Sequence, residues 1–228
     1  MSTSYFVNTQ PIQNTRMNKT IDQLYEDSCR NYSDIYQHIP TLRKYAEEEG
    51  VYSIAEFGVR DTSHSTNGLV KGLVEGKLRD GKQRKYLGID ISPCEYLYMR
   101  EIAKIFDIDY TFEVANSATY KFKEPVDLLF IDSFHTYPHL ALELDVSHSF
   151  VNKYIIMHDT TIDQFTSECI RCNMDIEKVS EESGYPIDKL VLGLQLAIDE
   201  FLEKHPEWRV KEVFTNNNGL TILERVSN

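Results

Sequence analysis

The sequence predicts one α/β domain built on a Rossmann-like, doubly wound sheet. Seven strands are expected, mostly parallel and ending in an antiparallel hairpin, with extra helices before the first strand. Three observations predict this fold. After Gly50, apolar strand candidates alternate with helix candidates, the order typical of parallel sheets covered by helices. Residues 126–132, VDLLFID, are nearly all apolar, as in a strand buried on both faces. Near the carboxyl terminus, two strand candidates flank an Asn-Gly turn, which predicts a hairpin.

The segment before the sheet is predicted to form a flexible arm, residues 1–17, followed by helices within residues 18–50. The arm is polar and shows no hydrophobic periodicity. A first helix begins at Ile21, and a second one ends at Gly50 and is divided or kinked by Pro40. Apolar residues of the second helix recur at helical spacing, at Ile35, Ile39, Leu42 and Tyr45.

The strands and covering helices follow in order, and no linker divides residues 18–228, which are therefore expected to form a single domain. Ser92 is expected to cap the helix after the second strand, with Pro93 in its first turn. The long polar segment 160–187 is expected to be an insertion that walls an acceptor site. The strand candidates are 51–57, 85–90, 108–114, 126–132, 153–159, 208–215 and 220–226, and the helix candidates are 66–78, 92–106, 139–151 and 188–205.

The composition argues against several classes of function. The 228 residues carry a net charge of −12, which repels phosphate backbones, so no nucleic-acid partner is expected. No stretch approaches the roughly 20 apolar residues that span a bilayer. The amino terminus also lacks the apolar region of a secretory signal, so a cytoplasmic location and no membrane partner are expected. The Cys169–Cys172 pair lacks a second pair to complete a zinc site, and reduced structural thiols are expected.

The ends of the first strands predict a nucleoside site, because ligands of open α/β sheets bind beyond the carboxyl ends of the strands. The first strand ends with Glu56 and Gly58, and the second ends with Asp90, an acceptor for both ribose hydroxyls. Asn116 and Ser117 follow the third strand. A dinucleotide pyrophosphate needs a glycine-rich turn, whereas S-adenosylmethionine (SAM) carries no phosphate. The single glycine of the first loop therefore favours SAM over NAD.

Strands four and five are expected to be neighbours, so that Asp132 and Asp159 converge over one crevice. Two carboxylates brought together repel unless a cation or proton lies between them, and Mg²⁺ or Mn²⁺ suits oxygen ligands. His158 is a candidate third ligand. His135 follows Asp132 by one short turn and titrates near neutral pH, which makes it a candidate base.

The order of these motifs resembles class I SAM-dependent methyltransferases. The motifs are Glu-x-Gly at 56–58, Asp90, FIDSFHTY at 130–137, HDT at 158–160 and the final hairpin. Within the class the chain is most similar to the group that includes the macrolide-sugar O-methyltransferases and the cephalosporin-hydroxylase-like proteins. It also resembles viral relatives that methylate glycan sugars. The resemblance covers residues 34–228.

The resemblance implies roles for individual residues. His135 matches the histidine of the D-x-x-H motif, the base that deprotonates a sugar hydroxyl, and Asp132 is counted with it as catalytic. Asp132 and Asp159 match metal ligands, and His158 stands where metal-binding members usually have an acidic residue. The cofactor-binding positions are then Glu56, Gly58, Arg60, Ser65, Asp90, Asn116, Ser117 and Asp132.

The predicted function is therefore transfer of the SAM methyl group to a hydroxyl of a small-molecule or glycan acceptor, with a sugar as the favoured substrate and Mg²⁺ or Mn²⁺ as a candidate second cofactor. Two alternatives stay open: an NAD-dependent oxidoreductase and a catalytically silent nucleoside-binding module. A homo-oligomer is a further open alternative. His139 and His148, on the helix after the fourth strand, are expected to be structural.

Overall fold

The computed structural model describes residues 19–60, 64–94 and 97–226, and the predicted arm lies outside them. The described residues contain one sheet with the order β3-β2-β1-β4-β5-β7-β6. Strands β1 to β5 pair in parallel, whereas β7 runs antiparallel to both β5 and β6, which confirms the predicted fold. The strands are β1 Ser53–Phe57, β2 Arg84–Asp90, β3 Ile108–Val114, β4 Val126–Ile131, β5 Val151–His158, β6 Trp208–Phe214 and β7 Leu220–Arg225.

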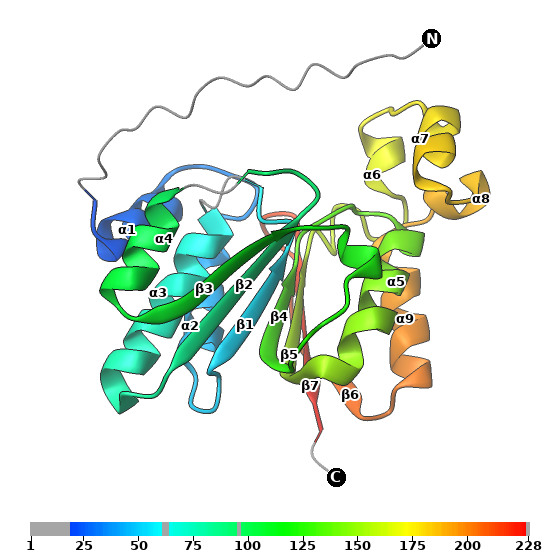
Figure 1. Cartoon of the computed structure of the whole chain (residues 1–228). Coiled ribbons are helices and arrows are strands. Elements are labelled where there is room, and N and C mark those ends of the chain that lie inside the picture. Colours follow the sequence, from blue (N-terminus) through cyan, green and yellow to red (C-terminus); the bar gives the residue numbers. More distant parts are fainter. Residues whose placement is uncertain (1–18, 61–63, 95–96, 227–228) are drawn as a thin grey trace.

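Helices cover both faces of the sheet (Figure 1). One face carries α1 Ile21–Arg30, α2 Ile39–Glu47, α3 His64–Asp80 and α4 Leu97–Ile105. The other face carries α5 Tyr137–Ser147 and α9 Leu194–Lys204. Between β5 and α9 the chain forms three short helices, α6 Glu168–Arg171, α7 Ile176–Ser183 and α8 Ile187–Leu190, beyond the carboxyl end of the sheet. Two 3₁₀ turns, η1 Ser117–Thr119 and η2 His148–Phe150, lie after β3 and before β5.

The core has two layers because side chains of a strand alternate between its faces. On β1, Ile54 packs toward α1 to α4, whereas its neighbours Ala55 and Phe57 pack toward α5 and α9. The same alternation divides β4, whose Phe130 belongs to the first layer and whose Leu129 belongs to the second. The central strands are buried on both faces, as their continuous apolar sequence predicts.

Three local predictions differ from the structure. Pro40 lies in the first turn of α2, where its missing N–H costs nothing, so it starts the helix and does not kink it. Helix α4 begins at Leu97, so Ser92 does not cap it. The single helix expected over 188–205 is divided into α8 and α9 at Gly193. A Cβ at Gly193 would lie 2.4 Å from the Asp163 carbonyl oxygen, which explains the glycine at this break.

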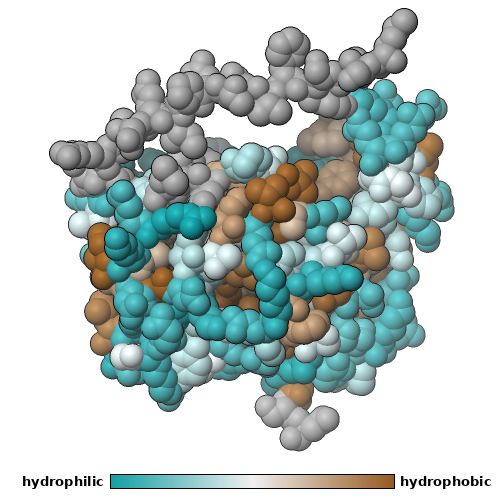
Figure 2. All heavy atoms as spheres, viewed as in Figure 1, coloured by the Kyte–Doolittle hydropathy of each residue, from teal (hydrophilic) through white to brown (hydrophobic). Residues whose placement is uncertain are grey.

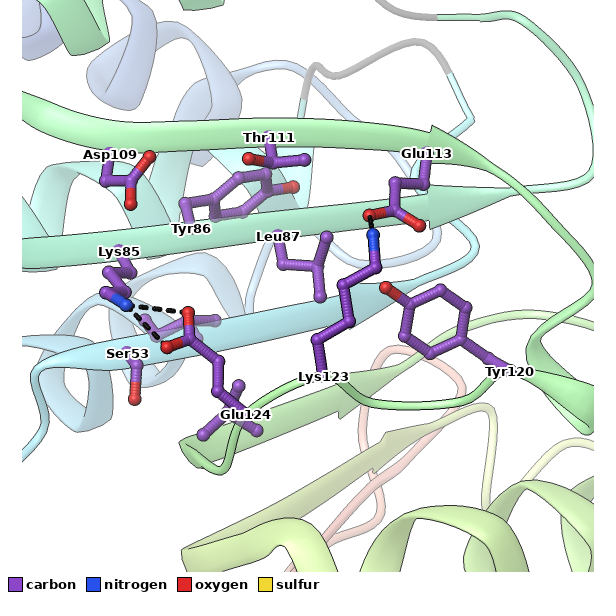
Figure 3. A pocket seen from close by; sticks show the side chains of 12 residues that line it. Ser53, Lys85, Tyr86, Leu87, Asp109, Thr111, Glu113, Tyr120, Lys123 and Glu124 are labelled. Atoms are coloured by element: carbon purple, nitrogen blue, oxygen red, sulfur yellow. Dashed lines mark hydrogen bonds and ion pairs between the residues drawn. The ribbon is translucent and has the colours of Figure 1, made fainter.

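The connection from β3 to β4 contains η1 and an extended loop, and no α-helix of the described residues covers β2 and β3 on the α5 side (Figure 1). The uncovered strands form a groove of about 200 Å³ (Figure 3). Four of its five charged groups form two ion pairs, Lys85 with Glu124 and Lys123 with Glu113. Figure 2 shows a mostly hydrophilic surface over this face, with a hydrophobic patch at its upper edge. The groove is therefore satisfied by its own ion pairs and lies away from the strand ends that carry the predicted site.

Candidate active site

Gly58 lies where the order of strands reverses, between β1 and β4, which is where open α/β sheets bind ligands. Its backbone N–H donates to the carbonyl of Ile89 at 3.0 Å, and the N–H of Asp132 donates to the carbonyl of Phe57 at 2.9 Å. Gly58 has a φ of 81°, and a Cβ there would lie 1.9 Å from the carbonyl oxygen of Asp132. The two strand ends therefore approach too closely for any residue with a side chain.

A pocket of about 440 Å³ opens beside Gly58. Asp90 lies in its wall, with one carboxylate oxygen accepting from the N–H of Arg60 and the other from the N–H of Ser92, each at 2.9 Å. These bonds hold the carboxylate at the end of β2. The predicted cofactor residues that line the pocket are Gly58, Arg60, Asp90, Asn116, Ser117 and Asp132.

One wall of the pocket is a chain of hydrogen bonds between side chains distant in sequence. The Ser117 hydroxyl bonds to Nε2 of His139 at 3.2 Å, and Nδ1 of His139 bonds to the Tyr185 hydroxyl at 3.0 Å. His139, predicted to be structural, thus supports two pocket residues and itself lines the pocket. The sequence indicates a pocket position for His139 only through its place in the first turn of the helix that follows β4. Tyr185 follows α7 in a polar segment without periodicity, so nothing in the sequence pointed to it.

Glu56 and Ser65 lie outside the lining of the large pocket. Glu56 is fully buried and accepts from the hydroxyls of Ser65 at 2.6 Å and Thr66 at 2.8 Å, and also from Tyr86. Burial raises the pKa of Glu56 to about 7, although these hydrogen bonds favour the charged form. Glu56 therefore ties the start of α3 to β1 and β2 and supports the loop from behind.

The loop after β1 borders a second, smaller hollow of about 20 Å³. Ser65 lines this hollow, which shares Gly58, Arg60 and Asp132 with the large pocket. The Arg60 side chain is 79% exposed and its guanidinium lies 3.9 Å from the Asp34 carboxylate. The two hollows are therefore adjacent.

The four residues singled out at the ends of β4 and β5 come together in one cluster. Nε2 of His135 lies 3.2 Å from the Asp132 carboxylate, and Nδ1 lies 2.9 Å from the Asp159 carboxylate. Nδ1 of His158 lies 3.4 Å from each of these two carboxylates. Parallel pairing of β4 with β5 produces this convergence, because it aligns the ends of the two strands.

Two further carboxylates surround His135 that the sequence did not single out. Asp163 and Glu168 each have an oxygen 3.5 Å from Nδ1 of His135. Asp163 is completely buried and accepts two hydrogen bonds of 2.7 Å from the guanidinium of Arg171. Both acids come from the polar segment after β5, where acidic residues are common and their direction cannot be read from the sequence.

The charges of the cluster shift each other's pKa values. Burial alone would lower the pKa of His135, but hydrogen bonds to the surrounding carboxylates raise it well above its usual range. Burial likewise lowers the pKa of His158, and Asp132 more than compensates, so that it is raised. The pKa of the Asp132 carboxyl is below its usual range because the two imidazoles outweigh its burial. The carboxylates of the cluster therefore favour the charged forms of both imidazoles.

The same atoms fit a divalent cation. Asp132, His158 and Asp159 offer ligand atoms that lie within 4.8 Å of one another. Nε2 of His158 bonds to the carbonyl of Asn217 at 3.2 Å, which directs Nδ1 to the carboxylates. Among the described residues, no hydrogen-bond partner reaches the buried Oδ1 of Asp159. The donor set of two carboxylates and one imidazole suits Mg²⁺, Mn²⁺ or Zn²⁺.

No protein-family model matches the chain, and no curated protein matches it in sequence. Solved structures match it in fold. The N-methyltransferase NodS from Bradyrhizobium japonicum is 11% identical, with a TM-score of 0.54 over 85% of this chain and 97% of NodS. The methyltransferase PaMTH1 from Podospora anserina, bound to S-adenosylhomocysteine (SAH), is 14% identical, with a TM-score of 0.53 over 93% of this chain and 89% of its own. An O-methyltransferase from Bacillus cereus in complex with SAH is 16% identical, with a TM-score of 0.50 over 94% of both chains.

The described part of the chain contains no helix with the length and apolar character needed to cross a bilayer. The solved structures are 11–16% identical to this chain, so the matches establish its fold alone.

Proposed function

From the premise that the chain has the fold of class I SAM-dependent methyltransferases, we propose that it transfers the methyl group of SAM to a hydroxyl, on a sugar of a glycan. One observation carries the proposal. Asp132 belongs both to the wall of the 440 Å³ pocket and to the cluster around His135, so a bound nucleoside and a proton acceptor would share one boundary. A methyl donor in the pocket would then face an acceptor hydroxyl at the cluster.

The pocket suits SAM. The Asp90 carboxylate is held at the end of β2 as an acceptor for ribose hydroxyls, and Asn116 and Ser117 border the space for a base. The smaller hollow beside Gly58 and Ser65 holds only about 20 Å³, roughly one water molecule, so the methionine part is proposed to extend from the large pocket past Gly58. The loop sequence carries one glycine, whereas a pyrophosphate needs a glycine-rich turn, and this supports SAM over NAD.

The transfer itself needs little covalent help. The acceptor oxygen attacks the methyl carbon, the carbon–sulfur bond breaks, and the sulfonium becomes the neutral thioether of SAH. The oxygen gives up its proton, and His135 is the group placed to receive it. Most of the catalysis would come from holding the hydroxyl in line with the methyl group.

The protonation of His135 decides whether it can act as a base. The surrounding carboxylates raise the pKa of His135 well above its usual range, which favours its protonated form. A divalent cation held by Asp132, His158 and Asp159 would acidify a nearby hydroxyl and offset the carboxylate charge. By offsetting that charge, the cation would lower the pKa of His135 and so favour the neutral form that accepts a proton.

A sugar is the favoured acceptor because the cluster offers several hydrogen-bond acceptors around one base. The Glu168 carboxylate accepts from the backbone N–H of His135 at 3.2 Å, its second oxygen lies 3.5 Å from Nδ1 of His135, and it is partly exposed, so an acceptor hydroxyl at His135 would also meet this carboxylate. Vicinal hydroxyls of a sugar require acceptors of this kind. The segment 160–187, which supplies Glu168, is accordingly proposed to wall the acceptor site.

Calorimetry with SAM, SAH and NAD tests the cofactor. SAM and SAH are expected to bind, and Asp90→Asn is expected to weaken both by at least about tenfold, since a hydrogen bond to a charged group contributes about 1.5–3 kcal/mol. Asp109→Asn is the matched control, because Asp109 is exposed at the amino end of the adjacent strand. Binding of NAD without SAM or SAH would overturn the proposal in favour of an oxidoreductase.

Methyl transfer to candidate glycans tests the chemistry. His135→Asn is expected to lower kcat by about 10²–10⁴-fold, the range of a lost general base, while SAM affinity stays within about twofold. Asp132→Asn is expected to lower kcat as well. Wild-type rates in both variants would refute the proposed mechanism, and the absence of transfer to any hydroxyl, with SAM bound, would favour a silent binding module.

A further inference from the structure

Three potential metal ligands lie together at the opposite end of the sheet from the candidate active site. They are His148 in η2, immediately before β5, and His205 and Glu207 in the turn between α9 and β6 (Figure 1). His158, at the carboxyl end of β5, belongs to the active-site cluster, so the length of β5 separates the two sites. The proposed methyltransferase reaction uses none of the three residues.

The ligand atoms are close enough to share one ion. Nδ1 of His205 lies 3.3 Å and Nδ1 of His148 lies 3.7 Å from the same oxygen, Oε1 of Glu207. One ligand atom from each side chain lies within 4.8 Å of the other two. Around a tetrahedral Zn²⁺ with bonds of about 2.0–2.2 Å, neighbouring ligand atoms are about 3.3–3.6 Å apart. The observed separations need only small side-chain adjustments to match this spacing.

His148 presents a buried nitrogen that the described protein leaves unsatisfied. No hydrogen-bond partner among the described residues reaches its Nδ1, and that atom has almost no contact with solvent. Burial lowers the pKa of His148, and nearby His205 lowers it further. A neutral imidazole is the form that binds metals, and an unpartnered buried nitrogen is uncommon in a native structure.

The surrounding structure holds the ligands in place. The two imidazole rings lie with centroids 4.0 Å apart, and Phe201 packs against His205 at 4.7 Å. The backbone N–H of His205 donates to the carbonyl of Phe201 at 2.9 Å, and the N–H of Trp208 donates to the carbonyl of His205 at 2.9 Å. The turn that carries His205 and Glu207 is therefore held by its own backbone hydrogen bonds, and ring packing holds the two imidazoles side by side.

We propose that His148, His205 and Glu207 bind Zn²⁺, with one coordination position left for water. Two imidazoles and one carboxylate are a ligand set that zinc accepts. The ion would connect the segment before β5 to the turn between α9 and β6, and so join the antiparallel end of the sheet to the helix that covers it. This inference does not depend on the proposed methyl transfer.

A fluorescence experiment can observe this site alone. Trp208 is the only tryptophan of the chain and adjoins Glu207, so a paramagnetic ion at the site quenches its emission. The metal-free full chain is titrated with Co²⁺, a spectroscopic substitute for zinc, and then with Zn²⁺. We expect saturable quenching with one equivalent of Co²⁺ and recovery of the emission when Zn²⁺ displaces it. A cation at the Asp132 cluster lies at the other end of β5 and leaves this signal unchanged.

Two variants and one control make the assignment. Glu207→Gln keeps the side-chain shape, and His205→Asn removes one imidazole. Each variant is expected to weaken Co²⁺ and Zn²⁺ binding by at least about tenfold, because replacing even a residue that only supports a metal ligand lowers metal affinity by about 10–100-fold. Glu203→Gln is the matched control, because Glu203 is exposed on α9 and outside the ligand set, and it is expected to bind like wild type. Absence of quenching in the wild type, or equal quenching in folded Glu207→Gln and His205→Asn variants, would overturn the proposal.

Discussion

At the scale of single residues, Gly58 decides whether the candidate cofactor pocket can form. The sequence shows only a glycine after a strand, a common feature of turns. The structure adds the reason: the backbone takes a φ of 81° while the end of β4 passes directly over it. Only glycine combines a left-handed conformation with so close a backbone contact.

Gly58→Ala is expected to weaken SAM binding by at least about tenfold and to destabilise the protein by more than backbone strain alone. The new methyl group would lie 1.9 Å from the Asp132 carbonyl, so the ends of β1 and β4 must separate. Gly81→Ala is the matched control, since Gly81 has a φ of 70° and no atom within 4 Å of the added Cβ. Gly81→Ala is expected to lower the free energy of unfolding by only about 1–2 kcal/mol. Urea unfolding and calorimetry measure both effects, and equal costs with unchanged SAM affinity in the two variants would contradict the argument.

At the scale of elements, α3 is almost surrounded by protein, because most of its residues from Ser65 to Gly76 are buried. Helices α1 and α2 cover the side that the sheet does not. Gly72 allows the closest approach: a Cβ there would lie 2.4 Å from the Arg43 carbonyl oxygen and 2.5 Å from the Ala46 Cβ. A glycine inside a helix costs about 1 kcal/mol relative to alanine, so its benefit lies in the packing of α2 on α3.

Gly72→Ala is therefore expected to destabilise the protein by about 1–3 kcal/mol despite the better helix propensity of alanine, because it overpacks the interface. In a double-mutant cycle with Ala46→Gly, part of this cost should be recovered, giving a favourable coupling energy of about 0.5–3 kcal/mol. Urea unfolding of the four proteins measures the coupling. Strict additivity would show that the two positions do not contact each other.

At the scale of the whole molecule, the fully buried Glu56 links pH to the stability of the fold. Its pKa is raised from the ordinary 4.5 to about 7, mainly by burial. The native state therefore holds a proton that the unfolded chain releases between these two values. Because the folded protein binds this proton more tightly, Glu56 contributes fully to the free energy of unfolding below pH 4.5. Its contribution falls as the pH rises from there through 7 and is constant above that.

Between pH 5 and pH 8, the free energy of unfolding of the wild type is accordingly expected to fall by about 2 kcal/mol more than that of Glu56→Gln. The glutamine of the variant has no proton to release. Urea unfolding at several pH values measures this difference in the free energy of unfolding. Glu203→Gln, an exposed glutamate, should retain the pH dependence of the wild type. Parallel curves for wild type and Glu56→Gln would mean that Glu56 titrates at its ordinary pKa in the folded protein.

Much of the candidate site could be predicted because it depends on strand ends. Once strands one, two, four and five were recognised as parallel neighbours, Gly58, Asp90, Asp132 and Asp159 had to lie along one edge. The direction of Glu56 was also readable, since it shares a strand face with Ile54 and therefore points toward α3. Its partners Ser65, Thr66 and Tyr86 were not, because the tertiary packing of α3 against β2 selects them.

The sequence by itself determined the order of the elements, the parallel sheet with its antiparallel end, and the residues at the strand ends, because hydrophobic periodicity and turn residues are local signals. Only the tertiary structure showed that Asp163 and Glu168 join His135, that His139 and Tyr185 close the pocket wall, and that His148, His205 and Glu207 meet. These residues come from loops, turns and exposed helix ends. Their directions are set by long-range contacts such as that between Gly193 and Asp163, which leave no pattern along the chain.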